Sequence, residues 1–153
     1  MASRKNLQVL ATLGLVLIAF CGVFAQPPKG ASKILAHTEY LRQDNLDKVV
    51  NQLMENGFEL EEVNKEYFFV KTAPKPFDKV SGDYYLHIVC KDSVITVSGK
   101  FNTNIDLNFG GATAKASYEP IINKGMKGSY YRDTFILMDE FVKLLRPRRI
   151  EYL

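Results

Sequence analysis

The stretches Tyr84–Cys90 (YYLHIVC) and Val94–Phe101 (VITVSGKF), separated by Lys91-Asp92-Ser93, decide the fold of this chain. Apolar and polar residues alternate along both, which is the pattern of β-strands with one buried face. If a hairpin loop of even length joins them, one face of the pair is almost wholly apolar and is expected to form the core. That face holds Tyr84, Leu86, Ile88, Cys90, Ile95, Val97 and Phe101. The opposite, polar face holds His87, Lys91, Thr96, Ser98 and Lys100.

Amphipathic helices are predicted on both sides of this hairpin along the chain. The apolar stripe of the first is Leu46, Val49, Val50 and Leu53. Asp44 or Asn45 can cap its N-terminus, and Gly57 can take the left-handed position after its end. The apolar stripe of the second is Tyr131, Phe135, Met138, Val142 and Leu145. Ser129 can cap this helix, and Pro147 stops it.

Further strands complete the predicted sheet. Residues 58–63 and 67–72 form a hairpin around Asn64-Lys65, and alternation resumes at Ile105, Leu107 and Phe109 in a further strand or a bent extension. A long connection, residues 110–129, leads to the second helix. The predicted order is therefore helix, four or five antiparallel strands, then helix. Two helices packed on the apolar face give an α+β sandwich of two layers.

The first 25 residues predict export from the cytoplasm. Arg4 and Lys5 precede an uncharged apolar stretch, and Val23-Phe24-Ala25 places small residues three and one before a cleavage site. We expect cleavage near Ala25–Gln26, which leaves the chain in the periplasm or outside the cell. A retained membrane anchor and a lipid anchor at Cys21 are the alternatives. The bulky residue before that cysteine counts against the lipid anchor.

The composition of the rest of the chain predicts three segments. Residues 26–36 are predicted to be a flexible leader, residues 37–146 a single α+β domain, and residues 147–153 a basic C-terminal tail. Residues 1–25 hold two of the 20 Lys and Arg residues and none of the 17 Asp and Glu residues, so the mature chain has a net charge of +1. This near neutrality gives no electrostatic reason to expect a nucleic-acid partner. We expect no integral membrane span in the mature chain.

The histidines, cysteines and acidic residues predict no catalytic residue, no cofactor and no metal site. Once Cys21 is removed, Cys90 stands alone, and we expect it to be a buried small hydrophobe. His87 is expected at the surface, with pH sensing or metal contact as the alternative. These two side chains point to opposite faces of one strand, which disfavours a nucleophilic pair. His37 is expected in the leader before the first helix, and the acidic run Glu59, Glu61 and Glu62 is expected to be a solvated face.

One loop has a plausible binding chemistry. The segment Lys124-Gly125-Met126-Lys127-Gly128-Ser129 leads into the second helix. Free backbone N–H groups, the positive end of the helix dipole and two lysines make it a candidate anion site, formed by Lys124, Gly125, Lys127, Gly128 and Ser129. The alternative is a flexible loop that ends in an N-cap. Its spacing is not that of a P-loop.

Aromatic residues suggest a second candidate surface. The residues concerned are Tyr67, Phe68, Phe69, Tyr84, Tyr85, Tyr130 and Tyr131. A glycan- or peptide-binding surface is one interpretation. The alternative is packing in the core and across strands, because strands favour aromatic residues.

Four segments carry a resemblance to known proteins. They are Met54–Leu60, Val70–Thr72, Lys91–Phe101 and Asn123–Ser129. In them the chain resembles small uncharacterised envelope proteins of Gram-negative bacteria, some of which are similar to the α+β folds of the TATA-box-binding protein and of β-lactamase-inhibitor proteins. The resemblance covers about residues 37–145. It implies an exported location and an α+β fold, and it transfers no catalytic residue.

The combined expectation is a non-enzymatic, exported binding or accessory protein whose partner is a protein or a cell-envelope component. The sequence also allows two alternative functions. One is an enzyme of unfamiliar type that uses the Lys124–Ser129 loop as an anion site. The other is a structural protein that associates with itself through an exposed sheet edge.

Overall fold

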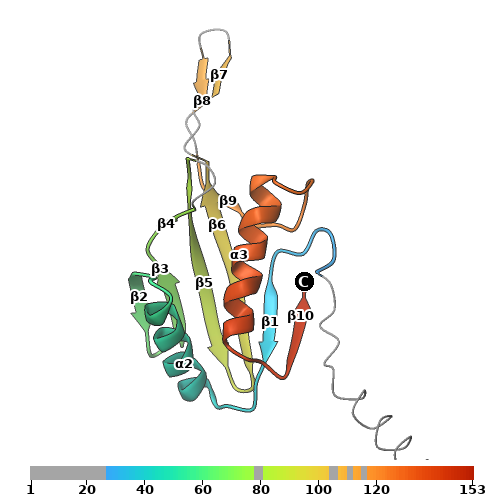
Figure 1. Ribbon diagram of the computed structural model, residues 1–153. Coiled ribbons are helices and arrows are strands. Elements are labelled where there is room, and N and C mark those ends of the chain that lie inside the picture. Colours follow the sequence, from blue (N-terminus) through green and yellow to red (C-terminus); the bar gives the residue numbers. More distant parts are fainter. Residues whose placement is uncertain (1–26, 78–80, 104–106, 110–111, 115–116) are drawn as a thin grey trace, which may run out of the picture.

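The computed structural model describes residues 27–77, 81–103, 107–109, 112–114 and 117–153. The predicted signal peptide, with Cys21, and the predicted strand residue Ile105 lie outside these ranges. The main feature is an antiparallel sheet whose one face is covered by two helices, α2 (Arg42–Glu55) and α3 (Tyr130–Leu144) (Figure 1). The α+β class and the antiparallel sheet are therefore confirmed.

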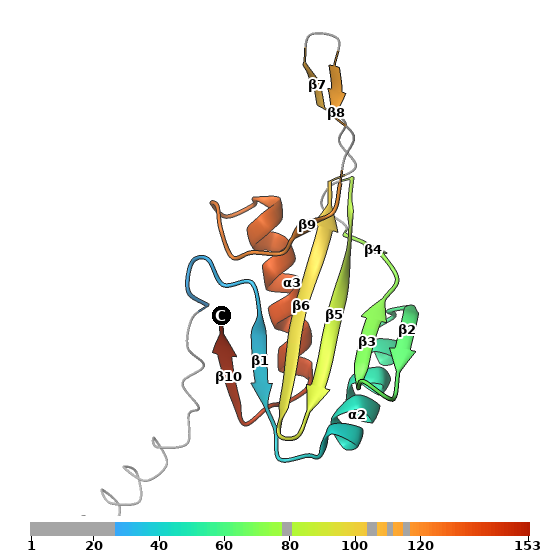
Figure 2. The same cartoon turned by 180° about the vertical axis from the view of Figure 1, so that it is seen from behind.

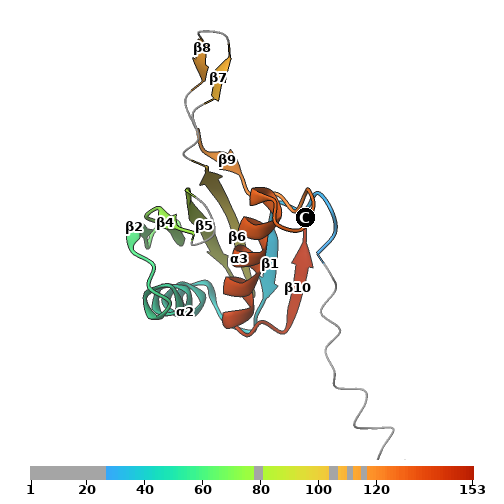
Figure 3. The same cartoon turned by 45° about the horizontal axis from the view of Figure 1, so that its top comes forward.

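The sheet is larger than the four or five strands that the sequence predicted. In the described residues it has eight strands, six of which follow the path β10-β1-β6-β5-β3-β2. These six are β1 (Ile34–His37), β2 (Leu60–Asn64), β3 (Phe69–Thr72), β5 (Asp83–Lys91), β6 (Val94–Asn102) and β10 (Arg149–Tyr152). The short strand β4 (Lys75–Pro76) pairs with β5, and β9 (Glu119–Pro120) pairs with β6. A separate pair, β7 (Leu107–Phe109) and β8 (Ala112–Ala114), lies beyond the end of β6 (Figure 3).

Both ends of the domain were predicted wrongly. Residues 34–36 were expected in the flexible leader, but they form most of β1, which lies between β10 and β6. Residues 149–152 were expected in the basic tail, but they form β10. The order is therefore strand, helix, strands, helix, strand. Each of these two strands has only four residues, which is the shortest length over which alternation indicates a strand.

The prediction that residues 110–129 form one long connection is also wrong in part. It contains strands β8 and β9. Ile121, which follows β9, is fully buried, and its N–H donates to the carbonyl oxygen of Gly99. A Cβ atom at Gly99 would lie 2.8 Å from the Cδ1 atom of Ile121. The glycine therefore leaves room on the core face of β6 for the side chain that returns from this connection.

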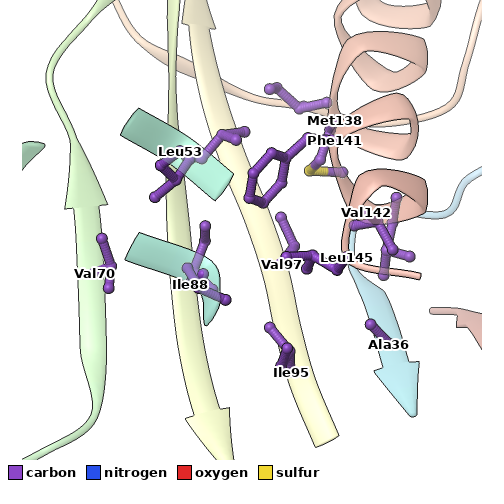
Figure 4. Close-up of a cluster of buried hydrophobic side chains, with 14 of the residues drawn as sticks. Ala36, Leu53, Val70, Ile88, Ile95, Val97, Met138, Phe141, Val142 and Leu145 are labelled. Carbon is purple, nitrogen blue, oxygen red and sulfur yellow. The ribbon is translucent and has the colours of Figure 1, made fainter. Parts of the chain in front are cut away.

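The central hairpin has the predicted register. Lys91 pairs with Val94, so the loop between β5 and β6 has two residues, an even number. All seven residues predicted for the apolar face are buried. Figure 4 shows Ile88, Ile95 and Val97 of this face in the same buried cluster as Leu53 of α2 and side chains of α3. The cluster contains Met138, Phe141 and Val142 of α3 and Leu145, the C-cap residue of that helix.

The predicted N-cap of α2 is wrong. Neither Asp44 nor Asn45 caps the helix. The N-cap residue is Leu41, and the N–H of Arg42 instead donates to Oδ1 of Asp92 in the β5–β6 turn at 2.9 Å. By contrast, the Ser129 cap of α3 and the left-handed Gly57 after α2 are confirmed.

Asn45 is fully buried and joins α2 to the central hairpin. Its Nδ2 donates to the carbonyl oxygens of Lys91 (2.8 Å) and Tyr40 (3.3 Å), and its Oδ1 accepts from the Thr38 hydroxyl at 2.9 Å. A buried carbonyl that loses its donor keeps the full desolvation cost. This side chain therefore fixes where the helix begins relative to the sheet.

We expect Asn45→Ala to lower the free energy of unfolding by ~1–3 kcal/mol, because it removes the hydrogen bonds of Asn45 to the Lys91 carbonyl oxygen and to the Thr38 hydroxyl. The Tyr40 carbonyl oxygen still accepts from the N–H of Ser93. Asn51→Ala is the matched control, since Asn51 is exposed on the same helix. That variant should be unchanged or slightly more stable, because alanine has the higher helix propensity. Urea unfolding followed by circular dichroism measures both. Equal stability of the two variants would show that Asn45 has no such role.

Candidate surface on the open face of the sheet

The face of the sheet opposite the helices is not covered by another layer among the described residues (Figure 2). We call it the open face. Because side chains alternate along a strand, the residues between the buried ones of β3, β5 and β6 point to it. They are Phe69, Lys71, Tyr85, His87, Val89, Thr96, Ser98 and Lys100. The predicted polar face thus carries aromatic side chains as well.

Four rings on this face contact one another in a row. The ring centroids of Phe69 and His87 are 5.4 Å apart, those of His87 and Tyr85 are 5.3 Å apart, and those of Tyr85 and Tyr118 are 4.9 Å apart. We call Phe69, His87, Tyr85 and Tyr118 the ring row. It crosses from β3 over β5 to the residue just before β9. The Phe69–His87 and Tyr85–Tyr118 contacts are edge-to-face, a favoured geometry for aromatic pairs, and the Tyr85–His87 contact is tilted.

Tyr118 is fixed at its end of the row by a carboxylate. Its hydroxyl donates to Oδ1 of Asp83, at the start of β5. Burial and this hydrogen bond raise the pKa of Tyr118 to about 12, so the phenol stays protonated as a donor. Tyr118 is nevertheless 36% exposed, which leaves part of its ring accessible to a ligand.

His87 lies in the middle of the ring row. Its Nε2 atom is buried and has no hydrogen-bond partner among the described residues. Burial lowers the pKa of His87 below its ordinary value of 6.5, and the charges of Lys71 and Lys100 lower it further. The imidazole is therefore neutral at pH 7 and acts as a third aromatic surface beside the tyrosines.

Charges on the open face are largely paired with each other. Nζ of Lys71 lies 2.6 Å from Oε1 of Glu61 and 5.1 Å from the centre of the Tyr85 ring. At the far end of the sheet, Arg149 lies 3.2 Å from Glu151, and His37 lies 3.1 Å from the same carboxylate. His37 is the last residue of β1, so the prediction that it lies in a leader is wrong. The face presents rings and polar groups without a strong excess of either charge.

The predicted anion loop makes contacts within the protein. Nζ of Lys124 lies 3.7 Å from the centre of the Tyr131 ring. Oγ of Ser129 accepts from the N–H of Arg132 (3.4 Å) and donates to the carbonyl oxygen of Lys124 (3.2 Å). Gly125 and Gly128 both have positive φ, and Lys127 is exposed. Anion binding by Lys124, Gly125, Lys127, Gly128 and Ser129 remains a prediction.

The aromatic residues singled out from the sequence divide between core and surface. Tyr84 is buried, and Tyr130 and Tyr131 pack against the core. Phe68 lies partly buried under the guanidinium group of Arg42, and Tyr67 is 70% exposed in the β2–β3 turn. Only Phe69 and Tyr85 belong to the ring row. Of the other two members, Tyr118 was missed. His87 was correctly placed on this face of the sheet, but its contact with Tyr85 was not recognised, although alternation along β5 places both side chains on the same face.

Cys90 and His87 lie on opposite faces of β5, as the sequence predicted. Cys90 is 2% exposed on the core face. Burial raises the pKa of its thiol to about 12. A nucleophilic pair formed by these two side chains is therefore excluded in this fold, and Cys90 acts as a small buried hydrophobe.

Within the described residues, no three His, Cys, Asp or Glu side chains gather closely enough to hold a metal ion. Neither α2 nor α3 is long and apolar enough to span a lipid bilayer. No protein-family model and no curated protein sequence matches this chain.

We expect Cys90 to be unreactive toward a thiol reagent in the native protein at pH 8 and to react once in guanidinium chloride, since the reactive species is the thiolate. Absorbance after addition of a chromogenic disulfide reagent gives the thiol count in both conditions. Rapid labelling of the native protein at Cys90, identified by mass spectrometry, would contradict the buried position.

The lowered pKa of His87 predicts a pH dependence of stability. A histidine whose pKa is lower in the folded state binds fewer protons there than in the unfolded state, so acid favours unfolding. As the pH falls below 6.5 toward the folded-state pKa, the wild-type protein should lose stability relative to His87→Asn. Urea unfolding of both proteins at pH 8 and pH 5 measures the difference. Parallel changes in the two proteins would rule out this role of His87.

Proposed function

We propose that this chain is a non-enzymatic, exported binding protein that holds a glycan of the cell envelope on the open face of its sheet. The ring row is the observation that carries the proposal. Three of its members come from adjacent strands, and the fourth is fixed by Asp83. Export itself rests on the sequence of residues 1–25, with cleavage near Ala25–Gln26.

Aromatic rings suit a sugar ligand because a sugar has apolar C–H faces and polar edges. The rings of Phe69, Tyr85 and Tyr118 offer apolar surface, and Ser98 and Thr96 place hydroxyl groups on the same face. A binding site of this kind combines apolar contact area with a few polar groups that set the orientation. The open face offers apolar rings and hydroxyl groups on neighbouring strands.

The charge pattern disfavours a polyanion. Lys71 is paired with Glu61, and Arg149 is paired with Glu151, so their positive charges are locally balanced. Nucleic-acid partners need clusters of cations that neutralise phosphates. The mature net charge of +1 agrees with this argument.

The Lys124–Ser129 loop does not enter this proposal. Its serine hydroxyl caps α3, and the ammonium group of Lys124 lies over Tyr131. Two of the groups that the enzyme alternative would use therefore already contact the protein itself, whereas Lys127 is exposed.

Binding can be tested with peptidoglycan sacculi purified from a Gram-negative bacterium. The protein, expressed from Met1 and purified after processing, should sediment with the sacculi. Tyr85→Ser should weaken binding about tenfold, the equivalent of ~1.4 kcal/mol for one lost ring contact. Tyr67→Ser is the matched control, because Tyr67 is exposed in a turn outside the ring row; its binding should be unchanged.

Two outcomes would overturn the proposal. If the protein does not sediment with sacculi or bind soluble glycan fragments derived from them, the glycan is not its ligand. If Tyr67→Ser and Tyr85→Ser weaken binding equally, the ring row is not the site. Capture of a protein partner by the same face, lost in Tyr85→Ser, would replace the glycan as the ligand.

A further inference from the structure

Strand β10 forms one edge of the sheet and is open to a further strand on its outer side in the described part of the chain. Lys33 and Leu153 exchange two backbone hydrogen bonds at 2.9 Å, so they form a hydrogen-bonded pair of the antiparallel ladder. Because such pairs alternate with non-hydrogen-bonded ones, Glu151 and Arg149 also bond toward β1. The backbone N–H and C=O groups of Ile150 and Tyr152 therefore point away from the sheet.

The opposite edge, β2, is protected in the way that natural edge strands usually are. Its ladder with β3 is interrupted by an irregularity between Leu60 and Glu62, and Glu61 and Glu62 are exposed. Bulges and charged side chains prevent an edge from pairing with another chain. β10 has an unbroken register with β1 and contains no proline. β10 also carries exposed charges, Arg149 and Glu151, but these are of opposite sign, whereas Glu61 and Glu62 of β2 are of the same sign. The two edges thus differ in their capacity to accept a second copy of the same strand.

The charges on β10 complement a second copy of the same strand. Arg149 and Glu151 are two residues apart on the open face, and their side chains are 67% and 44% exposed. If two β10 strands pair antiparallel with Ile150 opposite Ile150, Arg149 of each copy lies opposite Glu151 of the other. Opposite charges directly across strands are stabilising. Moving the symmetry axis to Glu151 would instead place two carboxylates opposite each other.

The backbone and the core agree with this register. An axis at Ile150 makes the two Ile150 residues a hydrogen-bonded pair, which uses the groups that point outward. The Ile150 side chain is 7% exposed on the face that the helices cover, so its pairing with Ile150 of the second copy continues the apolar layer.

We propose that this protein forms a homodimer by antiparallel pairing of β10 with β10 of a second copy, centred on Ile150. The two-fold axis is then perpendicular to the sheet, so both open faces lie on the same side of one continuous sheet. Two ring rows on one side would bind a repeating polymer at two points. The dimer itself does not depend on what the open face binds.

Charge reversal tests this register directly. Analytical ultracentrifugation of the protein, expressed from Met1 and purified after processing, should show a monomer–dimer equilibrium at low salt. Arg149→Glu alone and Glu151→Arg alone should each weaken dimerisation by about tenfold or more, because each places like charges opposite each other twice. An equimolar mixture of the two variants should restore a dimer with one copy of each. Glu62→Arg, at the β2 edge, is the matched control and should dimerise as the wild type does.

The mixing experiment separates this proposal from a general effect of charge. A protein that stays monomeric at all concentrations would overturn it. Dimers that persist in both single variants, or a mixture that fails to restore them, would show that the interface lies elsewhere. Sacculus binding by the monomeric variants reports on the ring row separately, since neither variant changes a residue of that row.

Discussion

Alternation along the β5–β6 hairpin is the constraint on which the rest of the structure depends. Every second residue from Tyr84 to Cys90 is buried, and so are Ile95, Val97 and Phe101. A surface this apolar must be covered, and both amphipathic helices lie on it. The same alternation leaves the intervening side chains, including Tyr85 and His87, on the opposite face. The core and the candidate surface are thus two consequences of one pattern.

The helices cover the hairpin at positions fixed by polar contacts. Asn45 and Asp92 tie the start of α2 to the β5–β6 turn. At the other side, the Tyr152 hydroxyl donates to Oδ1 of the nearly buried Asp139 at 2.9 Å, which joins β10 to α3. Apolar burial supplies most of the driving force but is non-directional. These hydrogen bonds are what give each helix a defined place on the sheet.

The sequence predicted the parts of the fold that have a long repeating pattern. Nine-residue strands and helices of 14 and 15 residues display enough periods for their buried faces to be identified. β1 and β10 have four residues each, and they acquire strand structure only by pairing with each other and with β6. The same holds for the candidate surface. Tyr118 joins the ring row because β9 pairs with β6, a contact between distant segments that no local pattern encodes.

The open face and the β10 edge have a feature in common that follows from this architecture. A sheet with helices on one side must keep its other side soluble, and here it does so with paired charges around a row of rings. Balanced charges limit repulsion between two copies, whereas a face of one sign would keep them apart. The Arg149–Glu151 pair at the edge belongs to the same balanced pattern. An open face with balanced charges is therefore also a face on which two copies can lie side by side.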